Sequence, residues 1–213
     1  MLELASWKAC WRALGVADAD EHLFYELLAC YDQPHRAYHT RQHLAECLAH
    51  QHAIEAEAER PAEVLLALWF HDAVYELRRS DNEARSASWA VAALRTAGVD
   101  QTVAERVHRL IMATRHDAVP EGRDAQVVVD VDLSILGADP ARFDEYERQV
   151  RQEYRWVPGP LFRRKRRELL RGFLDRPRLY TTDWFHARYE ARARANLRRA
   201  LAGLGIAVAE SST

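Results

Sequence analysis

Histidines and aspartates that could bind a metal recur between residues 39 and 132. His39 and His43 are four residues apart, a spacing that puts both side chains on one face of a helix. His71 and Asp72 end an apolar run, where either group needs a polar partner. A divalent metal would satisfy both, as would a hydrogen-bonded His–Asp pair of structural value only. Three later residues complete the set of candidate donors: His116, Asp130 and Asp132. Imidazole and carboxylate donors suit Mn, Fe, Zn, Ni or Co.

Helices are expected to position these side chains. The chain has only 8 glycines and 7 prolines, and its 48% hydrophobic and 29% charged residues are typical of a soluble globular protein. Thr40 is the predicted N-cap of a helix that runs to about Arg60. Pro61 suits the first turn of the next helix, which carries the apolar run and is predicted to end near Glu76. The β-branched run Val127–Leu133 would suit a strand or a buried helix, and its helical surroundings favour the helix.

Capping signals predict the remaining helices. The predicted N-caps are Ser6, Asp18, Asp81, Asp100 and either Thr182 or Asp183. We therefore expect an all-α bundle of about eight to ten helices. It should form a single domain over residues 1–205, with a metal-site core over about 35–140 and C-terminal helices over 141–205. Residues 206–213 are expected to form a flexible tail.

Charge and hydropathy limit the partners. A net charge of −2 gives no case for general nucleic-acid binding. No apolar run approaches the roughly 18 residues of a membrane span. Three cysteines without a CxxC motif and the absence of a signal-peptide pattern favour the cytoplasm. The basic run Arg163–Arg167 fits the wet side of an amphipathic helix, or alternatively a wall that attracts a nucleotide. Trp7 and Trp11 would form either core or the surface of a homodimer.

The order of these motifs resembles the HD-domain metal-dependent phosphohydrolases. His43, then His71–Asp72, then Asp132 follow the H…HD…D pattern of that family. The resemblance is closer to one bacterial branch of predicted HD-superfamily hydrolases and covers about residues 7–200. The segments that carry it are Tyr38–His43, Trp69–Tyr75, Asp81–Ala87, Ala113–His116, Asp130–Gly137, Val150–Tyr154 and, with shifted spacing, Glu190–Leu197.

The resemblance implies hydrolysis of a phosphoester or phosphoanhydride, in a small nucleotide-like substrate. The implied ligands of one divalent metal (Mn, Mg, Fe, Ni, Co or Zn) are His43, His71, Asp72 and Asp132. Such an ion activates water and polarises a phosphoryl oxygen. Proton transfer is expected from Glu83, Asp72 or Glu76, with Glu83 favoured over Glu76. Glu83 could instead be a capping-box partner of Ser80, and Glu76 a solvated helix end. The expected substrate contacts are His39, Tyr38, Arg36, His116 and Asn82.

Two other functions fit the same residues. A di-iron oxygenase or lyase on the HD scaffold would need a second metal, with His39 or His116 among its ligands. A non-catalytic nucleotide- or metal-binding module would leave the HD site unused. The chain has no second HD-type motif and lacks the extra histidines of cyclic-dinucleotide phosphodiesterases, which disfavours a signalling role on large substrates.

Overall fold

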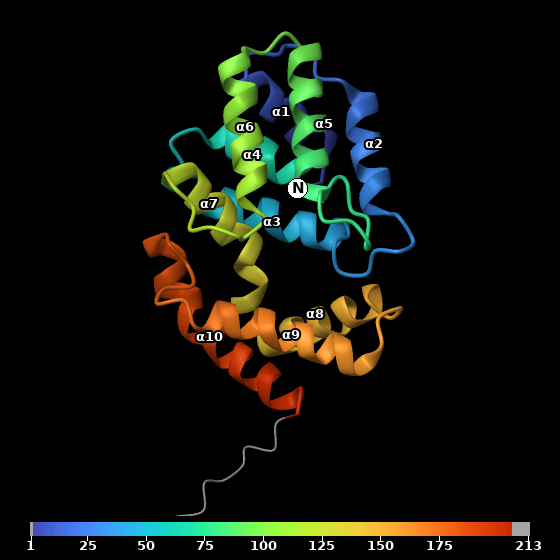
Figure 1. Ribbon diagram of the computed structural model, residues 1–213. Coiled ribbons are helices and arrows are strands. Elements are labelled where there is room, and N and C mark those ends of the chain that lie inside the picture. Colours follow the sequence, from blue (N-terminus) through green and yellow to red (C-terminus); the bar gives the residue numbers. More distant parts are fainter. Residues whose placement is uncertain (1, 206–213) are drawn as a thin grey trace, which may run out of the picture. The chain divides into compact units, whose positions relative to one another are not determined.

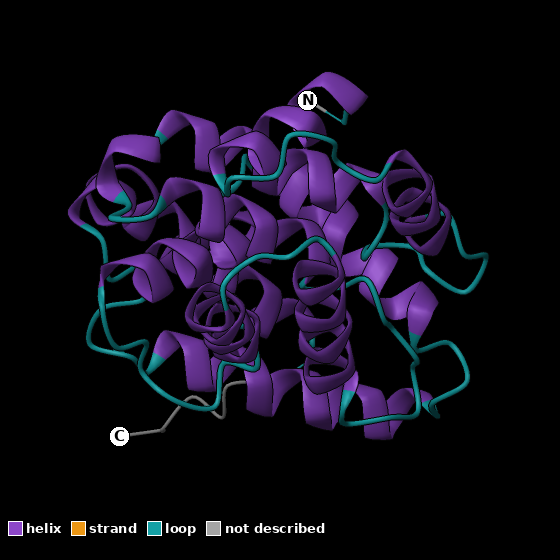
Figure 2. Cartoon of the chain, turned by 90° about the horizontal axis from the view of Figure 1, so that it is seen from above, coloured by secondary structure: helices purple, strands orange, loops and turns teal. Residues whose placement is uncertain are grey.

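The structure is a computed structural model of the chain and describes residues 2–205. Over this range it contains ten α-helices, two short 3-10 helices and no strand (Figure 2). The predicted all-α class with about eight to ten helices is therefore confirmed. The chain divides into two compact units, the first ending at Asp132 and the second beginning at Leu133. The tail predicted over 206–213 lies outside the described residues.

The first unit is built around the helix that carries the apolar run. Its elements are α1 (Leu4–Ala13), α2 (Glu21–Tyr31), α3 (Arg41–Ala53), the 3-10 helix η1 (Glu55–Glu57), α4 (Pro61–Phe70), α5 (Asn82–Thr96), α6 (Gln101–Ala113) and α7 (Arg123–Asp132) (Figure 1). Helix α4 contacts α1, α3, α5, α6 and α7. Leu66 to Phe70 are fully buried. Burial on all sides explains why this helix is apolar all round.

An aromatic cluster fixes the N-terminal helix against α4. The ring centroids of Trp7 and Trp11 are 5.4 Å apart, and Trp7 lies 5.4 Å from Trp69 in an edge-on contact. Phe24 of α2 joins the cluster at 5.8 Å from Trp69. Trp7 and Trp11 are both buried, so they are core residues and do not form the dimer surface that was the alternative.

Two predicted helix ends in the first unit are wrong. Tertiary contacts explain why the second of these helices ends early. The helix that begins after Thr40 ends at Ala53 instead of Arg60, and η1 follows it. The helix that begins at Pro61 ends at Phe70 instead of Glu76. Beyond Phe70, the backbone groups of residues 72–74 bond to side chains from other elements, which the α-helical pattern would not allow.

The helix caps were predicted with mixed success. Thr40, Asp100 and Thr182 each accept a hydrogen bond from the first turn of their helix, as predicted. The other predicted caps, Ser6, Asp18 and Asp81, do not: Ser6 lies inside α1, Asp20 caps α2, and the Asp81 carboxylate binds Arg79 instead. The preference for a helix over Val127–Leu133 is confirmed up to Asp132, where α7 ends.

The second unit contains η2 (Leu133–Gly137), α8 (Pro140–Glu153), α9 (Gly159–Leu174) and α10 (Asp183–Gly203). Helix α10 packs on η2, where the Asn196 amide donates to the carbonyls of Leu136 and Ala138 at 2.9 Å each. In the basic run of α9, Arg163, Arg164 and Lys165 are exposed, as expected for a wet face, whereas Arg166 is buried and binds Glu147. None of the helices described between residues 2 and 205 could span a membrane.

Candidate metal centre

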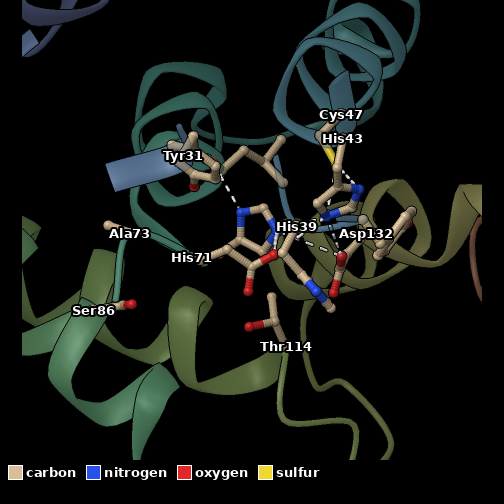
Figure 3. A network of polar contacts seen from close by, with 12 residues as sticks. Tyr31, His39, His43, Cys47, His71, Ala73, Ser86, Thr114 and Asp132 are labelled. Carbon is tan, nitrogen blue, oxygen red and sulfur yellow. Dashed lines mark hydrogen bonds and ion pairs between the residues drawn. The ribbon is translucent and has the colours of Figure 1, made fainter. Parts of the chain in front are cut away.

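Three elements of the first unit bring the predicted ligands together. His43 lies in the first turn of α3, directly after the Thr40 cap. His71 and Asp72 lie in the turn that follows α4, and Asp132 is the last residue of α7. Figure 3 shows the side chains of His43, His71 and Asp132 pointing toward one another. Residues from distant parts of the sequence thus meet at one point.

Four potential ligand atoms converge there: Nε2 of His43, Nε2 of His71, Oδ2 of Asp72 and Oδ1 of Asp132. The two Nε2 atoms are 3.1 Å apart, and each lies between 3.1 and 3.5 Å from the two carboxylate oxygens. Ligands about 2.1 Å from one ion would be about 3.4 Å apart in a tetrahedron, or about 3.0 Å for octahedral neighbours. The observed separations therefore fit a single divalent ion.

Hydrogen bonding orients the imidazole of His71 as a ligand. Its Nδ1 lies 2.8 Å from the Leu68 carbonyl oxygen, which can only accept, so Nδ1 carries the hydrogen. The lone pair of Nε2 is then directed at the cluster, an arrangement common among metal-binding histidines. The side chains of His43 and His71 are only 3% and 1% exposed, whereas those of Asp72 and Asp132 retain 17% and 13% exposure. The two carboxylates therefore form the side of the centre that is open to solvent.

The four groups perturb one another's pKa values strongly. Burial alone lowers the pKa of each histidine and raises that of each aspartate. Contacts among the four groups and with their neighbours, such as Cys47 and Tyr38 beside His43 and His116 beside Asp132, outweigh burial, so the pKa values of His43 and His71 lie well above, and those of Asp72 and Asp132 well below, their usual ranges. Two Nε2 atoms 3.1 Å apart cannot both direct a hydrogen at each other. A shared proton or a metal ion is therefore needed between them.

Two further histidines and a tyrosine lie beside the four ligands. Nε2–H of His116 donates to Oδ2 of Asp132 at 2.9 Å, so the two oxygens of this carboxylate face different partners. His116 adopts a positive φ of 58°, which is uncommon for a residue with a side chain. The His39 ring stacks on Tyr75 at 4.1 Å, and the Tyr38 ring lies 4.7 Å from that of His43. His39, Tyr38 and His116 thus lie beside the candidate ligands, and their contact with a substrate stays a prediction.

Among the described residues, no hydrogen bond or ion pair joins the other predicted catalytic and substrate-binding side chains to these ligand atoms. The Glu76 carboxylate is exposed and pairs with Arg85, while its backbone exchanges two hydrogen bonds with Asn82. Within the described chain, no hydrogen bond or ion pair joins Glu83 to the cluster. Glu83 is not a capping-box partner of Ser80 either, because the N-cap of α5 is Asp81. Arg36 directs its Nη donors to the backbone carbonyls of His39, Asp72 and Ala73.

Cys47 is the residue of the cluster that the sequence analysis did not identify as a candidate ligand. Its Sγ atom lies 3.7 Å from both Nδ1 and Nε2 of His43, so an overlapping donor set contains His43, Cys47, His71 and Asp132. Because the sulfur is equally far from both nitrogens, it does not lie along the direction of the Nε2 lone pair. The donor set that contains Asp72 would therefore need less side-chain movement to bind one ion than the set that contains Cys47. The i, i+4 spacing from His43 could have revealed Cys47 in the sequence.

Comparisons with protein-family models, with curated proteins and with solved structures gave no match to this chain. The chemistry has to be argued from the residues themselves. Two imidazole nitrogens and two carboxylate oxygens form a compact donor set that would leave positions on an ion open to water or substrate. The first unit therefore contains a candidate metal centre.

Proposed function

We propose that the protein is a divalent-metal-dependent hydrolase of phosphoester or phosphoanhydride bonds in a small, nucleotide-like substrate of the cytoplasm. The observation that carries the proposal is that Nε2 of His43 and Nε2 of His71 lie 3.1 Å apart and that each lies 3.1 to 3.5 Å from Oδ2 of Asp72 and Oδ1 of Asp132. An ion held there would polarise a phosphoryl oxygen and lower the pKa of water. The choice of phosphorus as the reacting centre rests on the sequence resemblance.

The neighbouring side chains suit the remaining tasks. Asp72 and Asp132 form the exposed side of the cluster, where a substrate could approach. His116 carries a proton on Nε2 next to Asp132 and is itself partly exposed, so it is placed to donate a proton to a leaving group. His39 and Tyr38 would contact the substrate on the side of α3. A base role for Glu83 or Glu76 stays a prediction without a supporting contact.

Phosphate release from a panel of nucleotides and simple phosphoesters tests the proposal. Each of Mn, Mg, Fe, Co, Ni and Zn would be tried with the wild type and with Asp72→Asn, which keeps the shape but removes the charge. Asp18→Asn, at an exposed position far from the cluster in the sequence, is the matched control. Metal-dependent turnover lost only in Asp72→Asn is expected. Equal turnover in all three proteins, or metal binding without turnover on any compound, would contradict it; the latter would favour a non-catalytic binding module.

One observation favours a second candidate, a di-iron oxygenase or lyase. Asp132 presents Oδ1 to the ligand cluster and Oδ2 to His116, so this carboxylate could serve two metals. His39 lies close enough to Asp72 to lower the pKa of that carboxyl. Two irons per chain together with oxygen consumption would support this candidate. One ion per chain would exclude it.

A further inference from the structure

Among the residues that the structure describes, Arg36 is a buried cation without a carboxylate partner. Its side chain lies in the segment between α2 and α3 and is only 6% exposed. All four of its hydrogen bonds end on uncharged oxygens: Nε donates to Gln33 Oε1 at 3.2 Å, Nη1 to the carbonyls of His39 at 3.1 Å and Asp72 at 2.7 Å, and Nη2 to the carbonyl of Ala73 at 3.0 Å.

Burying a charge in this way is costly unless the surroundings compensate it. Part of the compensation comes from two aromatic rings, because Cζ of Arg36 lies 5.2 Å from the centroid of Tyr31 and 5.4 Å from that of Tyr75. The four hydrogen bonds, to Gln33 Oε1 and to three backbone carbonyls, also contribute. A neutral side chain could fill the same space without the cost of burying a charge. The guanidinium at this position therefore points to a role for its hydrogen-bond donors.

The three carbonyls belong to the two segments that carry most of the metal ligands. His39 precedes α3, which presents His43, whereas Asp72 and Ala73 belong to the turn that presents His71 and Asp72. A planar guanidinium spreads its donors over two terminal nitrogens in a fixed arrangement and can bond all of these carbonyls at once, whereas the three donors of a lysine sit on a single nitrogen. The amine of a lysine could reach at most some of them.

We propose that Arg36 is a positioning residue of the metal centre, which holds the turn at His71–Asp72 in register with the start of α3. This inference rests on the metal centre of the proposed function. It replaces the expected contact of Arg36 with substrate phosphate, because the donors of the guanidinium face the backbone. Metal ligands tolerate little displacement, and loss of the groups that orient them weakens binding.

The proposal can be tested by measuring both the metal affinity and the thermal midpoint of variants of Arg36. Arg36→Met removes the charge, and Arg36→Lys keeps it but not the fork of donors. The matched control is Arg106→Met. Arg106 makes a two-pronged ion pair with Glu63, with Nε–Oε2 at 2.7 Å and Nη2–Oε1 at 2.6 Å, at the end of α4 opposite His71. Loss of Arg106 should lower the thermal midpoint of the metal-free protein without moving the ligands.

Both Arg36 variants are expected to bind Co²⁺ or Zn²⁺ about 10- to 100-fold more weakly than the wild type. Arg106→Met is expected to retain the wild-type Kd despite its lower thermal midpoint. If Arg36→Met does not fold, Arg36→Lys decides. A wild-type Kd in Arg36→Lys, or an equal loss of affinity in Arg106→Met, would overturn the proposal. Wild-type protein that binds metal but hydrolyses no phosphorylated compound would refute the proposed function and leave this inference standing.

Discussion

Protons should compete with the metal for His43 and His71 at pH values where ordinary histidines are already neutral. Although burial opposes it, neighbouring groups raise the pKa of both histidines well above the usual value. These are first Cys47 for His43 and Asp72 for His71, and then hydrogen bonds from both rings to Asp72 and Asp132. Each proton that a metal displaces changes the affinity about tenfold per pH unit below that pKa. Since Nδ1 of His71 is committed to Leu68 and only one hydrogen fits between two Nε2 atoms 3.1 Å apart, the raised pKa values mean that the pair holds one proton more than two neutral imidazoles, and one displaced proton is expected.

The Kd for Zn²⁺ or Co²⁺ should therefore fall about tenfold per pH unit as the pH rises, and the fall should continue well past about pH 6.5, the pKa of an ordinary histidine. Competition with a chromophoric chelator would measure it between about pH 6 and about pH 8. His52→Ala is the control, because His52 is an exposed histidine of the same helix. An affinity that is independent of pH, or that levels off near about pH 6.5, would refute the reasoning.

Three substitutions give further tests. Ser86→Ala should lower the free energy of unfolding by about 1–3 kcal/mol in chemical denaturation, because the buried Ser86 hydroxyl accepts from the Val74 N–H at 3.0 Å; unchanged stability would contradict this. Cys47→Ser should leave the near-ultraviolet spectrum of the Co²⁺-loaded protein unchanged, whereas loss of a sulfur-to-cobalt band would show that Cys47 is a ligand. Gly137→Ala should destabilise the second unit by about 1–3 kcal/mol, because an added Cβ would lie 2.8 Å from Cβ of Tyr189; an unchanged thermal midpoint would refute it.

Local signals in the sequence predicted the helices well. The apolar run before His71 indicated a helix buried on all sides, and α4 is such a helix. Thr40 and Asp100 were recognisable as caps because a short polar side chain precedes a helical pattern in each case. For Val127–Leu133, the helical context was a better guide than the β-branched residues themselves.

Features that depend on contacts between distant residues were harder to predict. Helix α4 ends six residues early, at Phe70 instead of Glu76, and Arg36 and Ser86 bond the backbone beyond it from elsewhere in the fold. Cys47 fits an apolar stripe equally well whether or not it touches His43. The expectation of a phosphate contact for Arg36 followed from the chemistry of arginine and not from its surroundings, which only the fold reveals.

Metal content per chain is the most direct test of the central claim, that His43, His71, Asp72 and Asp132 form one metal site. It would be measured on protein purified without chelator, for the wild type and for Asp72→Ala. About one divalent ion per chain, lost in Asp72→Ala, is the expected result. No ion in the wild type even after metal is added, or the same content in both proteins, would mean that the buried His–Asp cluster is structural only.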